Sequence, residues 1–438
     1  MTRNRNFKRL VRDRMAMTGE RYATARAHVV ARLGPAETPD DTGVFPAVTA
    51  IGGQQPDLAA ARNLCANAGI VGPDGGPLSE AMAFGLAGGI GFLYGVFEYD
   101  DGPTMTIVAR SESMPDPFVA PLFARAGAEL RVDTTGGSAT AARHLDAVIA
   151  EGTPALCTVG AGGLAYLGEA SDMAGMAPHL VGVVGVAGDG SILIDDRSPV
   201  PIAVPRDDFD RARAAYRKAK HRLCTITGVV AGHDWGAAVI EAVAATATGF
   251  DTPPVPQFAS NVGLPGLEKF HRLLTDERDP KRWRKVFAGG RSAAVGLSRL
   301  HDCIEYAYTA PSAGRPLYAT FLDDAAGLVD RARADRWRSA AEDFRASGER
   351  WASVAALAVG ADPALERYAE LAGARAAALD GAPNGTTMVE LAAEQSAAVD
   401  NCPIGAGAAA DVFDAVAGEV GVIIELERSA LDTLRAPG

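Results

Sequence analysis

Hydrophobic and polar positions follow two different patterns on either side of residue 205. Before it, short apolar runs alternate with helical segments. After it, apolar residues recur at intervals of three and four along Ala-rich and Arg-rich stretches. The first pattern is typical of mixed strands and helices, and the second of amphipathic helices. Together the two patterns predict an α/β domain over residues 46–204, a helical domain over 205–360 and a helical C-terminal extension over 361–438.

The chain is organised around residues 52–94, where the first strong helix of the α/β domain is expected. Asp57 stands where a helix N-cap belongs, and Gly69 stands where a left-handed residue would end the helix. The predicted helix over 57–68 is short, with small side chains on the face that packs inward. That face consists of Leu58, Ala61, Leu64, Cys65 and Ala68.

Three apolar runs in the second half of this domain predict neighbouring strands, over 155–159, 179–186 and 191–194. Gly188-Asp189-Gly190 separates the last two and has the composition of a tight hairpin turn. His179 opens one strand of this hairpin and Asp196 follows the other. A hairpin brings positions at this separation side by side, so we expect the two side chains to meet.

The glycine-rich run at 84–92 allows two interpretations. A nucleotide-binding loop would need a preceding strand and a later acidic residue at the dinucleotide spacing, and neither is present. Close packing of the backbone against a neighbouring element is the better interpretation. Further short strands are expected at 105–109 and 128–132, and helices at 117–126 and 139–150.

The region after residue 205 reads as entirely helical. The expected segments are 207–223, 235–247, 264–274, 280–287, 293–308, 317–346, 348–357 and 363–379.

Composition is that of an ordinary globular protein, with 48% hydrophobic and 22% charged residues. No apolar run is long enough to span a bilayer. The five cysteines are scattered and form no CxxC pair, which argues against disulfides and zinc and favours the cytoplasm. His301 and Cys303 lack metal-ligand spacing, so neither a metal nor another cofactor is expected.

The N-terminal residues 1–34 read as a small helical arm, joined to the α/β domain by a linker over 35–45. Nine of the first 32 residues are Lys or Arg and two are acidic, a net charge of +7, so the rest of the chain carries −19. Such an arm either folds back on the acidic body or meets a partner. A protein partner is expected rather than nucleic acid, because the arm offers few base-stacking residues.

Several of these motifs resemble the butirosin biosynthesis protein H-like family. In the first domain they are the Phe-Gly-Leu run at 84–86, Tyr166, His179 and Asp196. In the second domain they are Asn261, Trp283, Arg315, Phe321 and Trp351. The resemblance implies a papain-like fold with the helix at 57–68 packed against an antiparallel sheet, followed by the family's usual helical domain of unknown function.

The resemblance also assigns roles to residues. The family's His-Cys-Glu at the helix start reads Gln55-Pro56-Asp57 here, so the nucleophile position is degenerate. Cys65 lies about two and a half turns further along the helix and cannot replace the lost thiol. His179 and Asp196 match the catalytic base and its orienting acid, while Asp57 and Tyr166 are expected in the substrate cleft.

Two functions follow from these residues. The first is a degenerate acyltransferase-like protein that binds a carrier protein, metabolite or peptide in the old cleft. The second is an active acyltransferase that moves an acyl group from a carrier thioester to an amine, with His179 as general base. A peptidase is disfavoured by the missing thiol. The expected partners are an acyl carrier protein or a small-molecule amine, and a homo-oligomer is expected.

Overall fold

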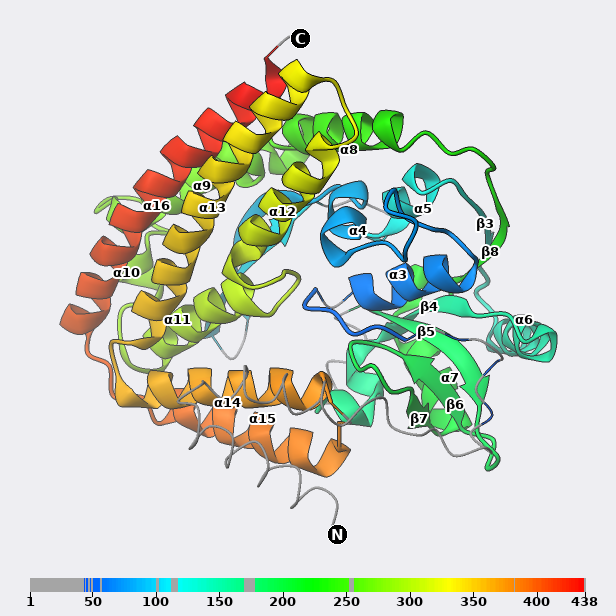
Figure 1. The fold of residues 1–438 in the computed structure, drawn as a ribbon. Helices are drawn as coiled ribbons and strands as arrows, with labels where there is room; N and C mark the ends of the chain where they lie inside the picture. The colour runs from blue at the N-terminus through cyan, green and yellow to red at the C-terminus, as the bar shows by residue number, and fades with distance from the viewer. Residues whose placement is uncertain are drawn as a thin grey trace, which may run out of the picture.

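The computed structural model describes residues 43, 45, 48, 50–55, 57–99, 102–111, 117–168, 178–251, 256–381 and 383–436. The predicted arm over 1–34, most of the predicted linker and Pro56 lie outside these residues. In the described part, a mixed α/β region with a sheet is followed by a largely helical region (Figure 1). None of its helices combines the length and hydropathy needed to cross a membrane.

A six-stranded sheet forms the centre of the first region, and every neighbouring pair in it is antiparallel. The strands predicted over 155–159, 179–186 and 191–194 are neighbours in this sheet. The strands in spatial order are β3 (Ala128–Asp133), β8 (Leu223–Val229), β4 (Ala155–Gly160), β5 (Pro178–Val186), β6 (Ile192–Asp195) and β7 (Ile202–Val204).

Both faces of this sheet are covered, which explains why β4 is buried along its whole length. On one face Leu156 and Leu180 join a core that includes α3 (Leu58–Asn67) and α4 (Glu80–Leu86). On the other face the alternate residues of the strands pack on α6 (Ser138–Glu151) and α7 (Arg206–Ala215). A short helix, α5 (Ala120–Arg125), precedes β3, and the turns η1 (Ala161–Gly163) and η2 (Ala165–Leu167) follow β4.

Strand β8 corrects the prediction that everything after residue 205 is helical. The expected helix over 207–223 ends at Ala215 and gives way to the turn η4 (Arg217–Ala219). Lys220 and His221 then adopt positive φ values of 49° and 51°, which no helix accommodates. The chain re-enters the sheet between β3 and β4, so the second region completes the sheet of the first.

A long hairpin of β1 (Ile90–Tyr99) and β2 (Gly102–Arg110) forms a separate two-stranded sheet. The sequence predicted part of β2 but missed β1. The predicted close packing of the glycine run is confirmed at Gly85, where a Cβ atom would lie 2.2 Å from the Phe321 ring. At the start of β1 an added Cβ atom would lie 2.4 Å from the Tyr318 ring at Gly89 and 2.6 Å from the Arg110 carbonyl oxygen at Gly91. The glycines that this close packing requires hid the start of the strand in the sequence.

The helical region wraps around this hairpin. Its first helices are α8 (Trp235–Gly249), α9 (Gly263–Thr275), α10 (Trp283–Val286) and α11 (Gly290–Glu305), with the turns η5 (Pro256–Asn261) and η6 (Ser312–Gly314). The later helices are α12 (Arg315–Ala326), α13 (Arg331–Val359), α14 (Pro363–Leu379), α15 (Gly385–Asp400) and α16 (Ala406–Arg435).

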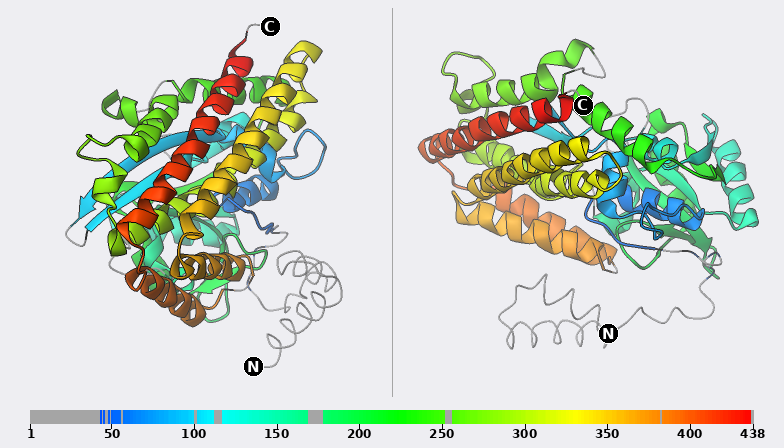
Figure 2. Two further views of the ribbon diagram at one scale, coloured as in Figure 1. Left: turned by 90° about the vertical axis from the view of Figure 1, so that its left-hand side faces the viewer. Right: turned by 45° about the horizontal axis from the view of Figure 1, so that its top comes forward.

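The C-terminal helix is part of the core of this region. Helices α13 and α16 run side by side along most of their lengths, as both views of Figure 2 show. The predicted helix over 317–346 is two helices, because the chain turns between Gly327 and Asp330, and Asp330 caps the second. The predicted break between 346 and 348 is absent, because α13 continues through it; at Gly348 an added Cβ atom would lie 2.8 Å from the Pro316 ring, so glycine allows this close contact.

Candidate functional site at the start of helix α3

The N-terminus of α3 faces the sheet at the place where β5 begins and β6 ends. Asp57 occupies the predicted N-cap position, but its side chain makes no capping hydrogen bond. Its backbone N–H donates instead to Oε1 of Gln55 at 2.9 Å. Gln55 has no exposed surface, and its Nε2 has no hydrogen-bond partner in the described structure. A buried amide without a partner is uncommon and marks a place where a polar ligand atom would be stabilised.

The segment before α3 is held in place from two sides. Oε1 of Glu80, on α4, accepts hydrogen bonds from the backbone N–H groups of Gln54 at 2.6 Å and Gln55 at 2.9 Å. Arg62 on α3 donates to the carbonyl oxygens of Gly52 at 2.7 Å and Ile51 at 3.2 Å. The approach to the helix is therefore fixed by charged side chains that the sequence did not single out.

His179 and Asp196 form the hydrogen bond that the hairpin pattern predicts. Nε2 of His179 lies 2.8 Å from Oδ2 of Asp196, and the two side chains are 12% and 3% exposed. His179 stands in β5, and Asp196 directly follows β6, which pairs with β5. Their catalytic roles remain a prediction.

Asp196 is the centre of this group. The Tyr166 hydroxyl donates to Oδ2 at 2.7 Å, and the backbone N–H of Arg197 donates to Oδ1 at 2.8 Å. Tyr166 comes from η2 and is buried, so the carboxylate is fixed from three directions. An acid held in this way can orient an imidazole and stabilise its protonated form.

The charges around the pair favour an ion pair at neutral pH. Burial alone would lower the pKa of His179, but the Asp196 carboxylate outweighs it and the pKa lies above its usual value. Burial likewise opposes ionisation of Asp196, yet the His179 charge and hydrogen bond hold the pKa of this carboxyl below its usual range. The same carboxylate and burial raise the pKa of Tyr166, which stays a hydrogen-bond donor.

A second carboxylate reaches the same site from α3. The charge of Asp57 contributes to the raised pKa of His179, and its Oδ2 accepts a short hydrogen bond from Arg110 at the end of β2. The Arg110 guanidinium lies 4.7 Å from the Phe118 ring centre and 5.6 Å from that of Tyr308. The predicted cleft residue Asp57 is thus engaged in a buried ion pair that the sequence did not reveal.

Two family models match this chain. Residues 57–197 match the model described as Butirosin biosynthesis protein H, N-terminal, and residues 207–398 match Domain of unknown function (DUF4872). This chain has the two-domain architecture of the butirosin biosynthesis protein H-like family. No curated protein matches the chain. The first match begins at Asp57, directly after Gln55 and Pro56, where the resemblance placed the nucleophile.

The butirosin protein H-like domain also carries a buried acid that the sequence analysis missed. Asp195, the last residue of β6, accepts from Nδ2 of Asn63 through both oxygens, at 3.1 and 2.9 Å. Burial raises the pKa of Asp195 to about 7, although the Asn63 hydrogen bonds oppose this shift. Asp195 therefore joins α3 to the sheet, and only Asp196 reaches His179. Side-chain alternation at the end of a strand could have separated the two roles.

None of the cysteines offers a nucleophile, and all of them lie in the described residues. All five cysteines are free and buried. Burial raises the pKa of Cys65 to about 12, and that of Cys157 to about 11. Cys65 packs in the core beneath α3, as expected for a small apolar residue.

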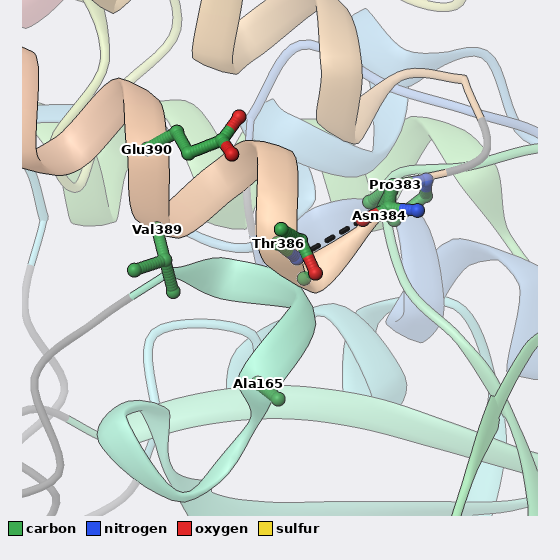
Figure 3. A pocket seen from close by; sticks show the side chains of 7 residues that line it. Ala165, Pro383, Asn384, Thr386, Val389 and Glu390 are labelled. Atoms are coloured by element: carbon green, nitrogen blue, oxygen red, sulfur yellow. Dashed lines mark hydrogen bonds between the residues drawn. The ribbon is translucent and has the colours of Figure 1, made fainter.

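A hollow of about 650 Å³ lies beside η2 (Figure 3). It is lined by Ala165, Pro383, Asn384, Gly385, Thr386, Val389 and Glu390. Tyr166, the residue after Ala165, sends its hydroxyl to Asp196. The hollow thus adjoins the backbone turn that holds the acid. Among the residues described, no group of three or more His, Cys, Asp or Glu side chains could hold a metal.

Proposed function

We propose that this chain is a degenerate acyltransferase-like protein, which binds an acyl-bearing partner in a papain-like cleft without forming an acyl-enzyme. The antiparallel sheet, with α3 packed on one face, supports the papain-like assignment. The observation that carries the proposal is the sequence directly before α3, which reads Gln55-Pro56-Asp57 and contains no cysteine at the position of the nucleophile.

Covalent acyl transfer needs a thiolate that attacks the thioester carbonyl and releases the carrier thiol. Neither Gln55 nor Pro56 supplies a nucleophile. Asp57 is held by Arg110 in a buried ion pair, so its carboxylate is not directed toward a substrate. A site that keeps its base and loses its nucleophile retains only a small part of its rate.

Binding remains possible because polar groups still converge on the cleft. The raised pKa of His179 favours the imidazolium form, which can donate a hydrogen bond. The unpartnered Nε2 of Gln55 is a second donor. Carbonyl oxygens accept such bonds, which fits the acyl group of a carrier protein, a metabolite or a peptide.

A second candidate function is direct acyl transfer to an amine, and the intact His179, Asp196 and Tyr166 group favours it. The amine nitrogen attacks the thioester carbonyl while neutral His179 takes its proton. The C–S bond then breaks, and the carrier sulfur leaves as a thiol with that proton. Because the pKa of His179 is raised, this rate would grow as pH rises through that pKa.

Intact-mass measurement after incubation with acyl-carrier thioesters separates these functions. We expect no acyl adduct on the native chain, and binding of the thioester that weakens in His179→Ala. Amide formation that depends on His179 would favour direct transfer. A stable acyl adduct on the native chain would overturn the proposal of a degenerate site.

We also propose a location and partners for this chain. The free, buried cysteines suit a reducing compartment such as the cytoplasm. An acyl carrier protein or a small amine remains the proposed partner of the cleft, and a protein the proposed partner of the arm over 1–34.

A further inference from the structure

A second hollow, of about 270 Å³, lies between η5 and the start of α9 in the helical region. Its lining residues are Ser260, Pro265, Glu268, Lys269 and Arg272. None of them belongs to the group around His179, so this hollow is separate from the site already described.

Two cations line this hollow, and the charge of a third, Lys281, acts on one of them, Lys269. Lys269, Arg272 and Lys281 make no ion pair in the described part of the chain, whereas nearby Arg284 and Arg428 each pair with a carboxylate. The pKa of Lys269 is lowered, first by burial and then by the charges of Lys281 and Arg272, which outweigh Asp279. Asp279 and Asp276 act on Lys269 and Arg272 through their charges, but among the residues described neither forms an ion pair with them, so the repulsion is only partly offset.

The acids beside the hollow are already engaged. Oε1 of Glu268 accepts from Nη2 of Arg428 at 2.8 Å, which draws this carboxylate toward α16. Oδ1 of Asp279 accepts from the backbone N–H of Lys281 at 2.8 Å. Oδ1 of Asp276 accepts backbone N–H groups of Arg278 at 2.6 Å and of Asp279 at 3.0 Å.

One asparagine fixes the cationic groups in place. Nδ2 of Asn261 donates to the carbonyl oxygen of Tyr94 at 2.6 Å, which orients the amide. Its Oδ1 accepts from Nζ of Lys269 at 3.1 Å and from the Ser260 hydroxyl at 3.3 Å. The Lys269 ammonium keeps two further N–H donors, and the Arg272 guanidinium beside it is exposed.

We propose that this hollow binds the phosphate group of a small ligand. Phosphate offers several charged oxygens, and a lysine ammonium beside an arginine fork matches them in charge and geometry. Binding would relieve the repulsion among the three cations.

Calorimetric titration of the full chain at low salt tests this site with inorganic phosphate, pyrophosphate and glycerol 3-phosphate. We expect saturable binding that weakens about tenfold or more in Lys269→Ala and in Arg272→Ala, because each loses a charged hydrogen bond. Lys218→Ala is the matched control, since this exposed lysine also has no ion pair among the residues described. Thermal unfolding of each variant checks that the fold is kept.

The three ligands distinguish the sources of the phosphate. Tighter binding of glycerol 3-phosphate than of inorganic phosphate would support an ester whose remainder fills the hollow. Tighter binding of free phosphate or pyrophosphate would support an inorganic ligand. Absence of binding at millimolar concentration, or equal weakening in Lys218→Ala, would overturn the proposal. So would unchanged binding in both Lys269→Ala and Arg272→Ala.

Discussion

Arg315 and Glu427 form a doubly hydrogen-bonded ion pair with no exposed surface in the middle of the helical region. The guanidinium Nε and Nη2 lie 2.8 and 2.9 Å from the two carboxylate oxygens. Ser347 and Trp351 also donate to Glu427, at 2.8 and 3.1 Å. Nη1 of Arg315 donates to the carbonyl oxygen of Ala109, at 2.8 Å. The pair thus ties α12, α13 and α16 to the hairpin that ends near Asp57.

Breaking this pair should lower stability strongly. Glu427→Gln leaves the Arg315 charge buried without its counter-ion, and we expect the free energy of unfolding to fall by about 3–5 kcal/mol. Denaturant unfolding measures the change. Glu419→Gln is the control, because it removes a surface pair with Arg350, which joins α16 to α13, and should cost about 1 kcal/mol or less. Equal effects of the two substitutions would contradict this account.

The pKa of Asp195 predicts that stability falls as pH rises. This carboxyl is protonated in the folded state up to pH of about 7, whereas in the unfolded chain it ionises near pH of about 4. Its contribution is therefore lost as pH rises from 4 to 7, by an amount on the order of 4 kcal/mol. Asp195→Asn should remove this part of the pH dependence, measured by unfolding at pH 5 and pH 8. The exposed Asp207→Asn should leave it unchanged, and a native-like slope in Asp195→Asn would refute the assignment.

Much of the sheet could be predicted because its central strands carry continuous apolar runs. The runs of β4, β5 and β6 are buried on both faces, and Gly188-Asp189-Gly190 marks the turn between the last two. Strand β8 could not be predicted in the same way. It follows an amphipathic helix without a Gly or Pro signal, and it pairs with β3 and β4, which are both distant from it in sequence.

In the candidate site, too, contacts within one hairpin could be predicted and contacts between distant elements could not. The contact between His179 and Asp196 is local, since one hairpin brings the two residues together, and the sequence predicts it. Arg110, Asn63 and the burial of Gln55 depend on how α3, β2 and the sheet pack in three dimensions. Spacing along the chain carries no signal for such contacts, so the partners of Asp57 and Asp195 emerged only from the structure.

Titration of His179 by NMR tests the ion pair at the site. We expect its pKa above the usual value of about 6.5 in the native protein. Asp196→Asn should lower it, because burial then acts without the opposing carboxylate. The pKa of His221, which burial and Arg213 lower, should not move and serves as the control. The raised pKa of His179 also means that its contribution to stability is complete below pH of about 6.5 and is lost as pH rises through the pKa of the folded state. An unchanged His179 pKa in Asp196→Asn would show that the carboxylate does not set its charge.

We propose that the site keeps the base and the acid of a cysteine enzyme and lacks only the thiol. Alkylation of Pro56→Cys by a thiol-reactive probe over a range of pH tests it most directly. The native chain provides the background, because its five cysteines are buried. Pro73→Cys places a thiol in an exposed loop as the control.

We propose that a thiol between Gln55 and Asp57 is stabilised as a thiolate by the start of α3 and by His179, because Asp57 precedes this helix and its charge acts on His179. We predict that Pro56→Cys reacts at a pH well below the ordinary thiol pKa of about 8.5, at least about tenfold faster than Pro73→Cys at neutral pH. Adding His179→Ala should abolish the difference. A Pro56→Cys variant that reacts no faster than Pro73→Cys, with or without His179, would contradict the claim.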